Sequence, residues 1–378
     1  MKGKEFSISD PVPSTPVPER SRRVRFPIRS LSIVEGRFWN GAGFFLLVIV
    51  LLLFFLLDLL VGSVPISLSQ SISTLFHPSS SDPQIASILF QFRIPKAITA
   101  VMAGAALSVA GLQMQTVFRN PIAGPDILGI SSGASLGVAL FVLSTGWFFK
   151  GALLFSMAGS WGIVLAAWLG AGCMMLLIVL IASKLRDLMT VLILGILISS
   201  AILSIVGVLQ YFSSESSLKS FMVWTMGSLG STTRDQLWVL VPSVLAGLAM
   251  ALLSAKYLDA FLLGENYARS MGMNLRLAYL LVFASTSILA GSITAFCGPI
   301  GFVGIIVPHL ARKFFRSPLH GRLIPSTMLL GAVVMLIGDI VSQLPGYETT
   351  LPINSVTALL GIPIVIWIIF QNKKIGAL

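Results

Sequence analysis

Long apolar runs separated by short polar segments make up most of this 378-residue chain. A helix that crosses a bilayer needs about 20 mostly apolar residues, so each such run is read as a membrane span. This rule predicts ten spans: residues 40–61, 93–117, 125–145, 151–183, 190–212, 237–255, 275–296, 299–316, 324–344 and 353–371. Glycine and proline interrupt the third, eighth and tenth runs. We therefore predict an all-α polytopic membrane protein, a compact bundle of about ten transmembrane helices with some helices broken.

The composition excludes most other classes of protein. Hydrophobic residues make up 56% of the chain and charged residues 10%, whereas soluble domains carry about 25% charged residues. That is too little charge to cover the surface of a soluble globular protein of this size. The two cysteines form no C-x-x-C or Cys/His cluster, so we expect neither a disulfide framework nor a metal site.

Positive charge gathers at the ends of the apolar runs, which is a topology signal and not the stripe of a nucleic-acid-binding surface. We interpret residues 1–36, rich in proline and then in arginine, as a disordered basic cytoplasmic tail against anionic membrane lipid, and residues 37–378 as the membrane domain. With the N-terminus inside, ten spans place 20 Lys and Arg in inside segments and 5 in outside segments. This bias predicts that both termini are cytoplasmic.

Acidic residues in or near the spans leave a second class of function open. Asp58, Asp126 and Asp339 would be costly in lipid, and such residues are usually functional or paired. A proton-coupled secondary transporter would use them as a relay. The alternative, which we favour, puts Asp58 and Asp339 near the outer ends of their spans and makes Asp126 a helix cap of the third span. None of the three has a basic residue nearby in sequence.

The motifs of an enzyme are missing from the sequence. There is no G-x-x-x-x-G-K-[ST], so if ATP drives this protein the ATPase is another chain. Residues 129–133, Gly-Ile-Ser-Ser-Gly, come near an intramembrane serine protease pattern but miss its spacing. We predict a transport subunit and not an enzyme, because a positioned nucleophile and base are not found.

Two polar segments stand out against this apolar background. Arg93 and Lys96 lie three apart at the outer end of the second span, where positive charge is unusual, and either receive acidic residues of a docking partner or snorkel to the interface. In the inside segment 256–276, Glu265 to Met271 are good helix formers and Gly272 is a C-terminal stop. A short surface helix there would be a rigid handle for another protein; a merely structural loop is the alternative.

In combination, a series of short blocks resembles the permease subunits of binding-protein-dependent ABC importers for iron-siderophores, haem and cobalamin, the FecCD-type permeases. The resemblance extends from about residue 40 to 372. Its first blocks are Arg93-Ile94-Pro95-Lys96, Gly104-Ala105-Ala106-Leu107, Gly111-Leu112-Gln113-Met114-Gln115, Arg119-Asn120-Pro121-Ile122-Ala123 and Ser131 through Gly137. The later ones are Gly227-Ser228-Leu229, Leu263-Gly264-Glu265 with Ala268-Arg269 and Gly272, Gly298-Pro299-Ile300-Gly301-Phe302-Val303-Gly304 with Pro308-His309, and Gly361-Ile362-Pro363.

The resemblance implies a partner set and a role for several residues. It implies a type II importer permease in the bacterial inner membrane, acting as a homodimer with two ABC subunits that use ATP and Mg²⁺, while this chain binds no cofactor. It implies that Arg93 and Lys96 dock a periplasmic or lipid-anchored substrate-binding protein. Gln343 stands where some relatives carry a third basic residue. The residues that it assigns to ATPase coupling are Gly264, Glu265, Ala268, Arg269 and Gly272, and those that it assigns to a cytoplasmic gate are Asn120, Pro121, Ile122, Leu188 and Met189.

The cargo is the least determined part of this interpretation. Iron chelates, haem and cobalamin all need a wide apolar cavity, and the sequence does not identify its lining. We expect an iron-siderophore or haem, with cobalamin as the alternative.

Overall fold

The computed structural model describes residues 33–375, with gaps at 63, 65, 78–81, 144–150, 185–187 and 344–349. The arginine-rich part of the predicted tail lies outside the described residues, and the first helix begins at Ile33. Among the described residues every regular element is a helix, which confirms the predicted all-α class.

Each predicted span has a helix in the structure. Seven segments are long and apolar enough to cross a membrane, and they lie in α1 (Ile33–Leu60), α4 (Ile94–Val117) with the turns that precede it, α6 (Gly151–Lys184), α7 (Leu188–Tyr211), α9 (Arg234–Leu253), α12 (Leu275–Cys297) and α14 (His320–Ser342). The three interrupted runs form α5 (Ile130–Leu143), α13 (Val303–Phe315) and α15 (Ile353–Ile375). Ten crossings therefore remain a prediction, because these three helices are shorter or are described over a shorter apolar stretch.

Left-handed backbone explains two of the interruptions. The third run starts as a 3-10 turn, η3 (Pro125–Leu128), and Gly129 at φ 74° separates that turn from α5. The eighth run begins its helix only after Phe302, whose φ is 68°. Positive φ does not fit an α-helix, so each apolar run yields a shorter helix than its length suggests.

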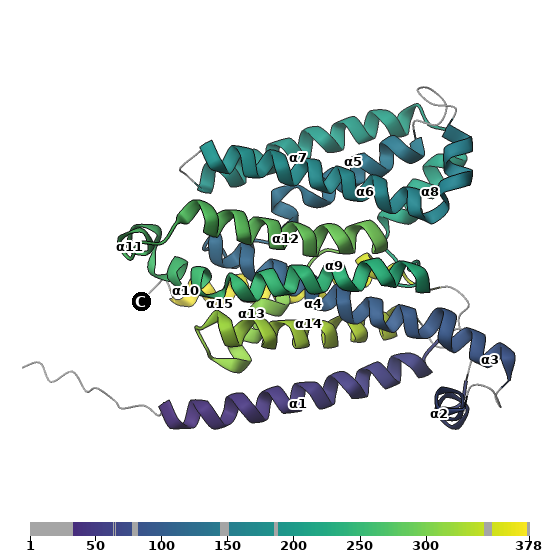
Figure 1. The fold of residues 1–378 in the computed structure, drawn as a ribbon, viewed down its shortest axis with the longest axis horizontal. Coiled ribbons are helices and arrows are strands. Elements are labelled where there is room, and N and C mark those ends of the chain that lie inside the picture. Colours follow the sequence, from purple (N-terminus) through teal and green to yellow (C-terminus); the bar gives the residue numbers. More distant parts are fainter. Residues whose placement is uncertain are drawn as a thin grey trace, which may run out of the picture.

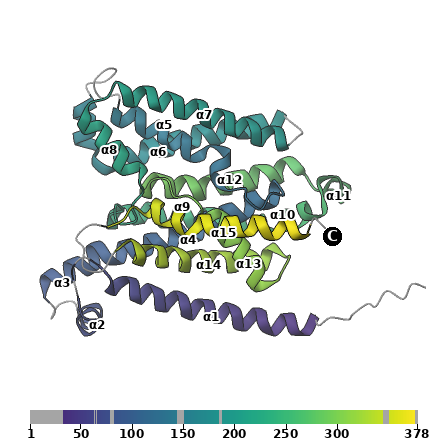
Figure 2. The ribbon, with the colours of Figure 1, turned by 180° about the vertical axis from the view of Figure 1, so that it is seen from behind.

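Short helices lie at both ends of the bundle (Figure 1). One end carries α2 (Leu68–Phe76), α3 (Pro83–Ser87), the π-turn η2 (Ile88–Arg93) and α8 (Glu215–Thr225); the other carries α10 (Ala255–Leu263) and α11 (Glu265–Ser270). We call them the α8 end and the α11 end. Helix α1 begins and α15 ends at the α11 end, as the view from behind also shows (Figure 2).

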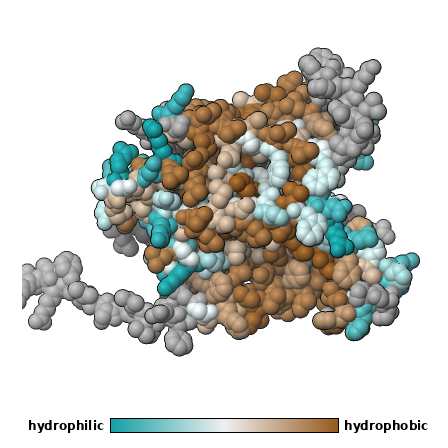
Figure 3. Space-filling model, in the orientation of Figure 1, coloured by the Kyte–Doolittle hydropathy of each residue, from teal (hydrophilic) through white to brown (hydrophobic). Residues whose placement is uncertain are grey.

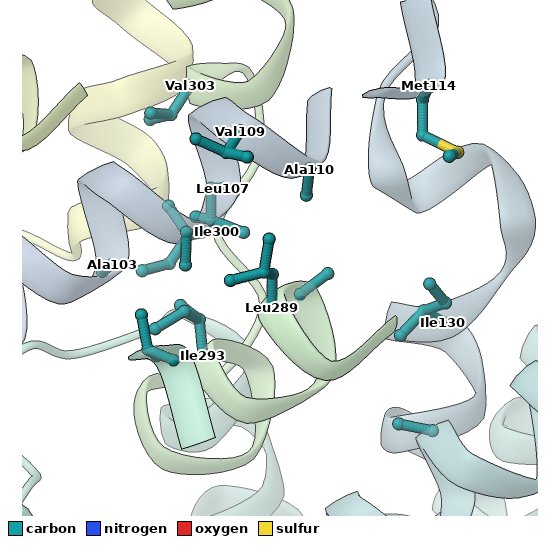
Figure 4. Close-up of a cluster of buried hydrophobic side chains, with 14 of the residues drawn as sticks. Ala103, Leu107, Val109, Ala110, Met114, Ile130, Leu289, Ile293, Ile300 and Val303 are labelled. Carbon is teal, nitrogen blue, oxygen red and sulfur yellow. The ribbon is translucent and has the colours of Figure 1, made fainter. Parts of the chain in front are cut away.

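Helix α4 is the centre of the bundle. It packs against α14 and α13 on one side and α12 and α9 on the other, and 83% of its apolar window is buried, whereas only 11% is buried for α1 at the periphery. Side chains of α4 and α12 meet in an apolar cluster, with Leu107 and Leu289 in its middle (Figure 4). Space-filling atoms show apolar side chains over the middle of the molecule and polar ones at its two ends (Figure 3).

Glycine pairs bring the central helices into backbone contact. A Cβ on Gly111 would overlap the carbonyl oxygen of Gly304 on α13, and a Cβ on Gly104 would overlap that of Gly331 on α14. Small residues at such crossings permit the close van der Waals packing that holds helices together in lipid. The small residues of the second span therefore mark where α4 packs closely against α13 and α14.

Candidate functional site

Arg93 closes the end of the neighbouring helix α1. It is the last residue of η2, is only 5% exposed, and its guanidinium donates hydrogen bonds to the carbonyl oxygens of Leu59 (2.7 Å), Leu60 (3.1 Å) and Val64. The last carbonyls of a helix have no partner within the helix, so a cation that binds them stabilises the terminus. Arg93 thus connects the start of α4 to the end of α1.

Lys96 has an acidic partner within the chain. Its Nζ lies 2.9 Å from Oδ2 of Asp339 on α14, and the amide of Gln343 donates to the same Oδ2 at 2.9 Å and to Oδ1 of Asp58 at 3.5 Å. Asp58 is fully buried, and its Oδ2 has no hydrogen-bond partner among the described residues. The five side chains Asp58, Arg93, Lys96, Asp339 and Gln343 form what we call the α8-end polar cluster.

This cluster confirms where the sequence places Asp58 and Asp339, and it adds a partner for Asp339. Asp58 and Asp339 do lie near the ends of their helices, as predicted. The sequence does not predict the pairing of Asp339 with Lys96, because the two are far apart in the chain. A signal was available, since a lysine and an aspartate that enter apolar runs at the same side of the membrane each need a partner there.

The expectation that Asp126 caps the third span is wrong. Asp126 lies inside η3, and its carboxylate accepts a hydrogen bond from the hydroxyl of Ser131. Gly129 interrupts the apolar run, so α5 begins at Ile130, after Asp126.

A cavity of about 580 Å³ opens beside the α8-end polar cluster. Its lining includes Arg93, Lys96, Asp339 and Gln343 of the cluster, together with Val223 and Met226 of the α8 region. Helix α8 and the residue that follows it therefore form part of the cavity wall. The ammonium of Lys96 and the carboxylate of Asp339 are therefore paired in the wall of this cavity.

At the α11 end the predicted surface helix is present. Gly264 (φ 112°) and Gly272 (φ 83°) lie on either side of α11, in backbone conformations that favour glycine. Ala268 is fully buried and fixes the helix against the bundle, whereas Arg269 is exposed and Glu265 is half-buried. The residues predicted to couple to an ATPase therefore form one short, rigid, partly exposed element.

The residues predicted to form a gate lie in two segments. Asn120, Pro121 and Ile122 follow α4 in a turn in which the Asn120 side chain accepts from the Ile122 N–H at 3.1 Å. Leu188 and Met189 begin α7, and Met189 is exposed. Helix α4 ends and α7 begins toward the α11 end of the bundle (Figure 1). Their role as a gate stays a prediction.

Comparison with known proteins identifies the family. The model of the FecCD transport family matches residues 50–371, which is most of the chain. The chain belongs to the FecCD transport family. This is a family of ABC transporter permease subunits, which are transport components and not enzymes.

Named relatives and a solved structure agree with this membership. The chain is 35% identical over 334 residues to the hemin transport system permease protein HmuU of Yersinia pestis, covering 85% of this chain and 95% of that protein. It is 33% identical over 288 residues to the vitamin B12 import system permease protein BtuC of Klebsiella pneumoniae, covering 76% and 84%. A structure described as an inward-facing conformation of a metal-chelate type ABC transporter matches with a TM-score of 0.75 and 28% identity, over 88% of this chain and 99% of that one.

Proposed function

We propose that this FecCD family member is the membrane-spanning permease subunit of an ATP-driven importer that carries an iron chelate, a siderophore complex or haem, across the bacterial inner membrane. The observation that carries the proposal is the arrangement of the bundle. A cavity with a polar cluster lies at one end, and a short exposed helix, α11, lies at the other. The end with the cavity is suited to receive cargo, and the end with α11 is suited to contact an ATPase subunit.

In this proposal the α8 end faces outward and meets a substrate-binding protein. Lys96 lines the cavity, so an acidic residue of the binding protein would meet it there. Arg93 also lines the cavity, and its hydrogen bonds hold the end of α1 against the start of α4. Two copies of the chain would enclose the pathway, and lipid would cover the remaining apolar surface.

The α11 end then faces the cytoplasm and an ATPase subunit. Closure of two such subunits around ATP and Mg²⁺ would move α11, and the permease would change from an outward-open to an inward-open form. The chain supplies no covalent chemistry; the partners bind the two forms with different affinity, and that difference drives the change.

The cargo assignment rests on the relatives. One is named for hemin and the solved structure for metal chelates, which favours an iron chelate. Cobalamin is the alternative, because a relative of nearly equal identity is named for vitamin B12 import.

A proton-coupled transporter is disfavoured by the α8-end polar cluster. Asp339 is ion-paired with Lys96, and both Asp339 and Asp58 lie within the last turn or so of their helices. A relay needs acids that exchange protons along the path, and a cluster at one end of the bundle does not provide that path.

The experiment is uptake by proteoliposomes that contain the permease with its ATPase and binding protein. Haem, a ferric siderophore and cobalamin are offered separately, with ATP or with a non-hydrolysable analogue, and with or without a protonophore. We expect uptake of an iron chelate that requires hydrolysable ATP and is insensitive to the protonophore. Uptake without the ATPase, driven by a proton gradient, would overturn the proposal; uptake of cobalamin alone would overturn the cargo assignment.

A further inference from the structure

A hydrogen-bond chain that is partly exposed at Asp259 and buried at His320 and Thr116 joins α10 to the end of α4. Oδ1 of Asp259, on α10, accepts from the backbone N–H of His320 at 2.8 Å and lies 2.7 Å from Nδ1 of its ring. His320 is the first residue of α14 and is 1% exposed. A carboxylate can only accept, so Nδ1 carries the proton in this contact.

The far side of the same ring meets α4. Nε2 of His320 lies 2.9 Å from Oγ1 of Thr116, a buried residue next to the last residue of that helix. Oγ1 of Thr116 also lies 2.9 Å from the carbonyl oxygen of Leu112, one turn earlier. The imidazole thus contacts Asp259 on one side and Thr116 on the other, where the single hydroxyl proton of Thr116 is shared between Nε2 and the Leu112 carbonyl.

A second contact joins α10 to the residues just beyond α4. Nη2 of Arg119 donates to the carbonyl oxygen of Phe261 at 2.9 Å. Arg119 has a left-handed backbone at φ 48°, unusual for a residue other than glycine, and it directly precedes Asn120 of the predicted gate. The Phe261 ring stacks on Tyr279 of α12 at 4.8 Å between centroids, which fixes this carbonyl in place.

We propose that Asp259 and His320 are positioning residues that couple movement of the α10–α11 segment to the end of α4 and to the gate residues that follow. The inference rests on the proposed function, because the linkage transmits movement only if an ATPase moves α11. Coupling of this kind is carried by hydrogen-bonded networks and rigid helices that have two arrangements. His320 and Thr116 are buried and Asp259 is only partly exposed, so loss of the linkage should uncouple cargo uptake from ATP hydrolysis and leave hydrolysis running.

The test measures cargo uptake and ATP hydrolysis in the same proteoliposomes of the full complex. Asp259→Ala removes the near end of the linkage, and Thr116→Val removes the far hydroxyl with little change in shape. We expect uptake per ATP to fall about 3-fold to 30-fold in each variant, the range in which residues of a coupling network act. Asp235→Ala, an exposed aspartate on α9 at the opposite end of the bundle, is the matched control and should keep the wild-type ratio.

The double variant decides whether the two residues act as one unit. If they do, Asp259→Ala with Thr116→Val loses no more than the stronger single variant, whereas independent sites would multiply their losses. Multiplied losses, or a wild-type uptake per ATP in either single variant, overturn the linkage. If Asp259→Ala prevents the ATPase from co-purifying, Thr116→Val, which lies away from α11, still decides. Failure of the proposed function would be visible separately, as absence of ATP-dependent uptake by the wild-type complex.

Discussion

Arg93 and Lys96 are both basic residues at the end of one apolar run, but they bind different partners in the structure. They lie three residues apart at one end of one apolar run and both line the cavity, but the guanidinium of Arg93 is bound by backbone carbonyls at the end of α1, whereas the ammonium of Lys96 is paired with Asp339. The spacing alone leaves docking and anchoring equally open for both. Only the position of α1 and α14, which is a tertiary property, separates them.

We therefore expect Arg93→Lys and Lys96→Gln to fail in different assays. Arg93→Lys keeps the charge but loses the planar fork that reaches several carbonyls, so the melting temperature of the purified permease should fall. Each hydrogen bond to a charged group contributes about 1.5–3 kcal/mol. Affinity for the binding protein should stay within about two-fold, since a charge near the docking surface is retained.

Lys96→Gln should instead weaken docking by about ten-fold, as expected for loss of one partly buried charge pair. Its amide still donates to Asp339, which limits the loss of stability. Lys219→Gln, an exposed lysine on α8 at the same end, is the control and should dock as wild type. Binding is measured with the immobilised binding protein. Weaker docking of Arg93→Lys with an unchanged melting temperature would reassign the docking role to Arg93.

Glycines let the central helices of this bundle approach backbone to backbone, and Gly111 is the clearest case. The carbonyl oxygen of Gly304 occupies the space that a Cβ at residue 111 would need, so Gly111→Ala forces α4 and α13 apart. Overpacking costs typically 1–3 kcal/mol, at about the upper end here because the obstacle is backbone and not a flexible side chain. We expect a melting temperature lower by several degrees in detergent and a lower yield of folded protein.

A glycine with free space around it is the control for this change. A Cβ on Gly207 of α7 would meet nothing within 4 Å. Gly207→Ala should keep or raise the melting temperature, because alanine is favoured over glycine in a helix by about 1 kcal/mol. Equal melting temperatures for Gly111→Ala and the wild type would show that the crossing of α4 and α13 is looser than the structure has it.

The helices differ in how far the sequence predicts them. Hydropathy finds every long one, because lipid requires an apolar run of fixed length. It does not locate the breaks at Gly129 and Phe302, which depend on a left-handed residue inside an apolar run. Helix α2 lies between the first two predicted spans, where hydropathy predicts no element, although its capping box, Ser67 with Gln70, is visible in the sequence.

The site divides in the same way between local and distant contacts. Helix α11, with Gly264 and Gly272 beside it, follows from neighbouring residues, so the sequence predicts it correctly. The contacts of His320 with Asp259 and Thr116 join three helices that are separated by long stretches of chain. Scattered histidines and acids in one sequence do not reveal such partners, because pairing depends on how the helices pack.

The complete bundle has two chemically different ends, and the direction of transport depends on which one faces the cytoplasm. Helix α1 begins and α15 ends at the α11 end, which an even number of crossings requires. The bias of Lys and Arg predicts that this end is cytoplasmic. Cysteine labelling tests the orientation directly: Cys173 is exposed and is first replaced by serine, whereas Cys297 is buried and can remain. Asn266→Cys on α11 and Glu215→Cys on α8 then place one exposed thiol at each end.

A membrane-impermeant maleimide distinguishes the two ends in intact spheroplasts. We expect it to label Glu215→Cys and to spare Asn266→Cys until the membrane is opened. Inside-out vesicles should give the reverse, which excludes poor thiol reactivity as the reason for protection. Labelling of Asn266→Cys in intact spheroplasts would put α11 outside, beyond the reach of any cytoplasmic ATPase, and the proposed direction of force and of cargo would both be wrong. The docking role of Lys96 and the coupling role of α11 therefore both depend on this orientation.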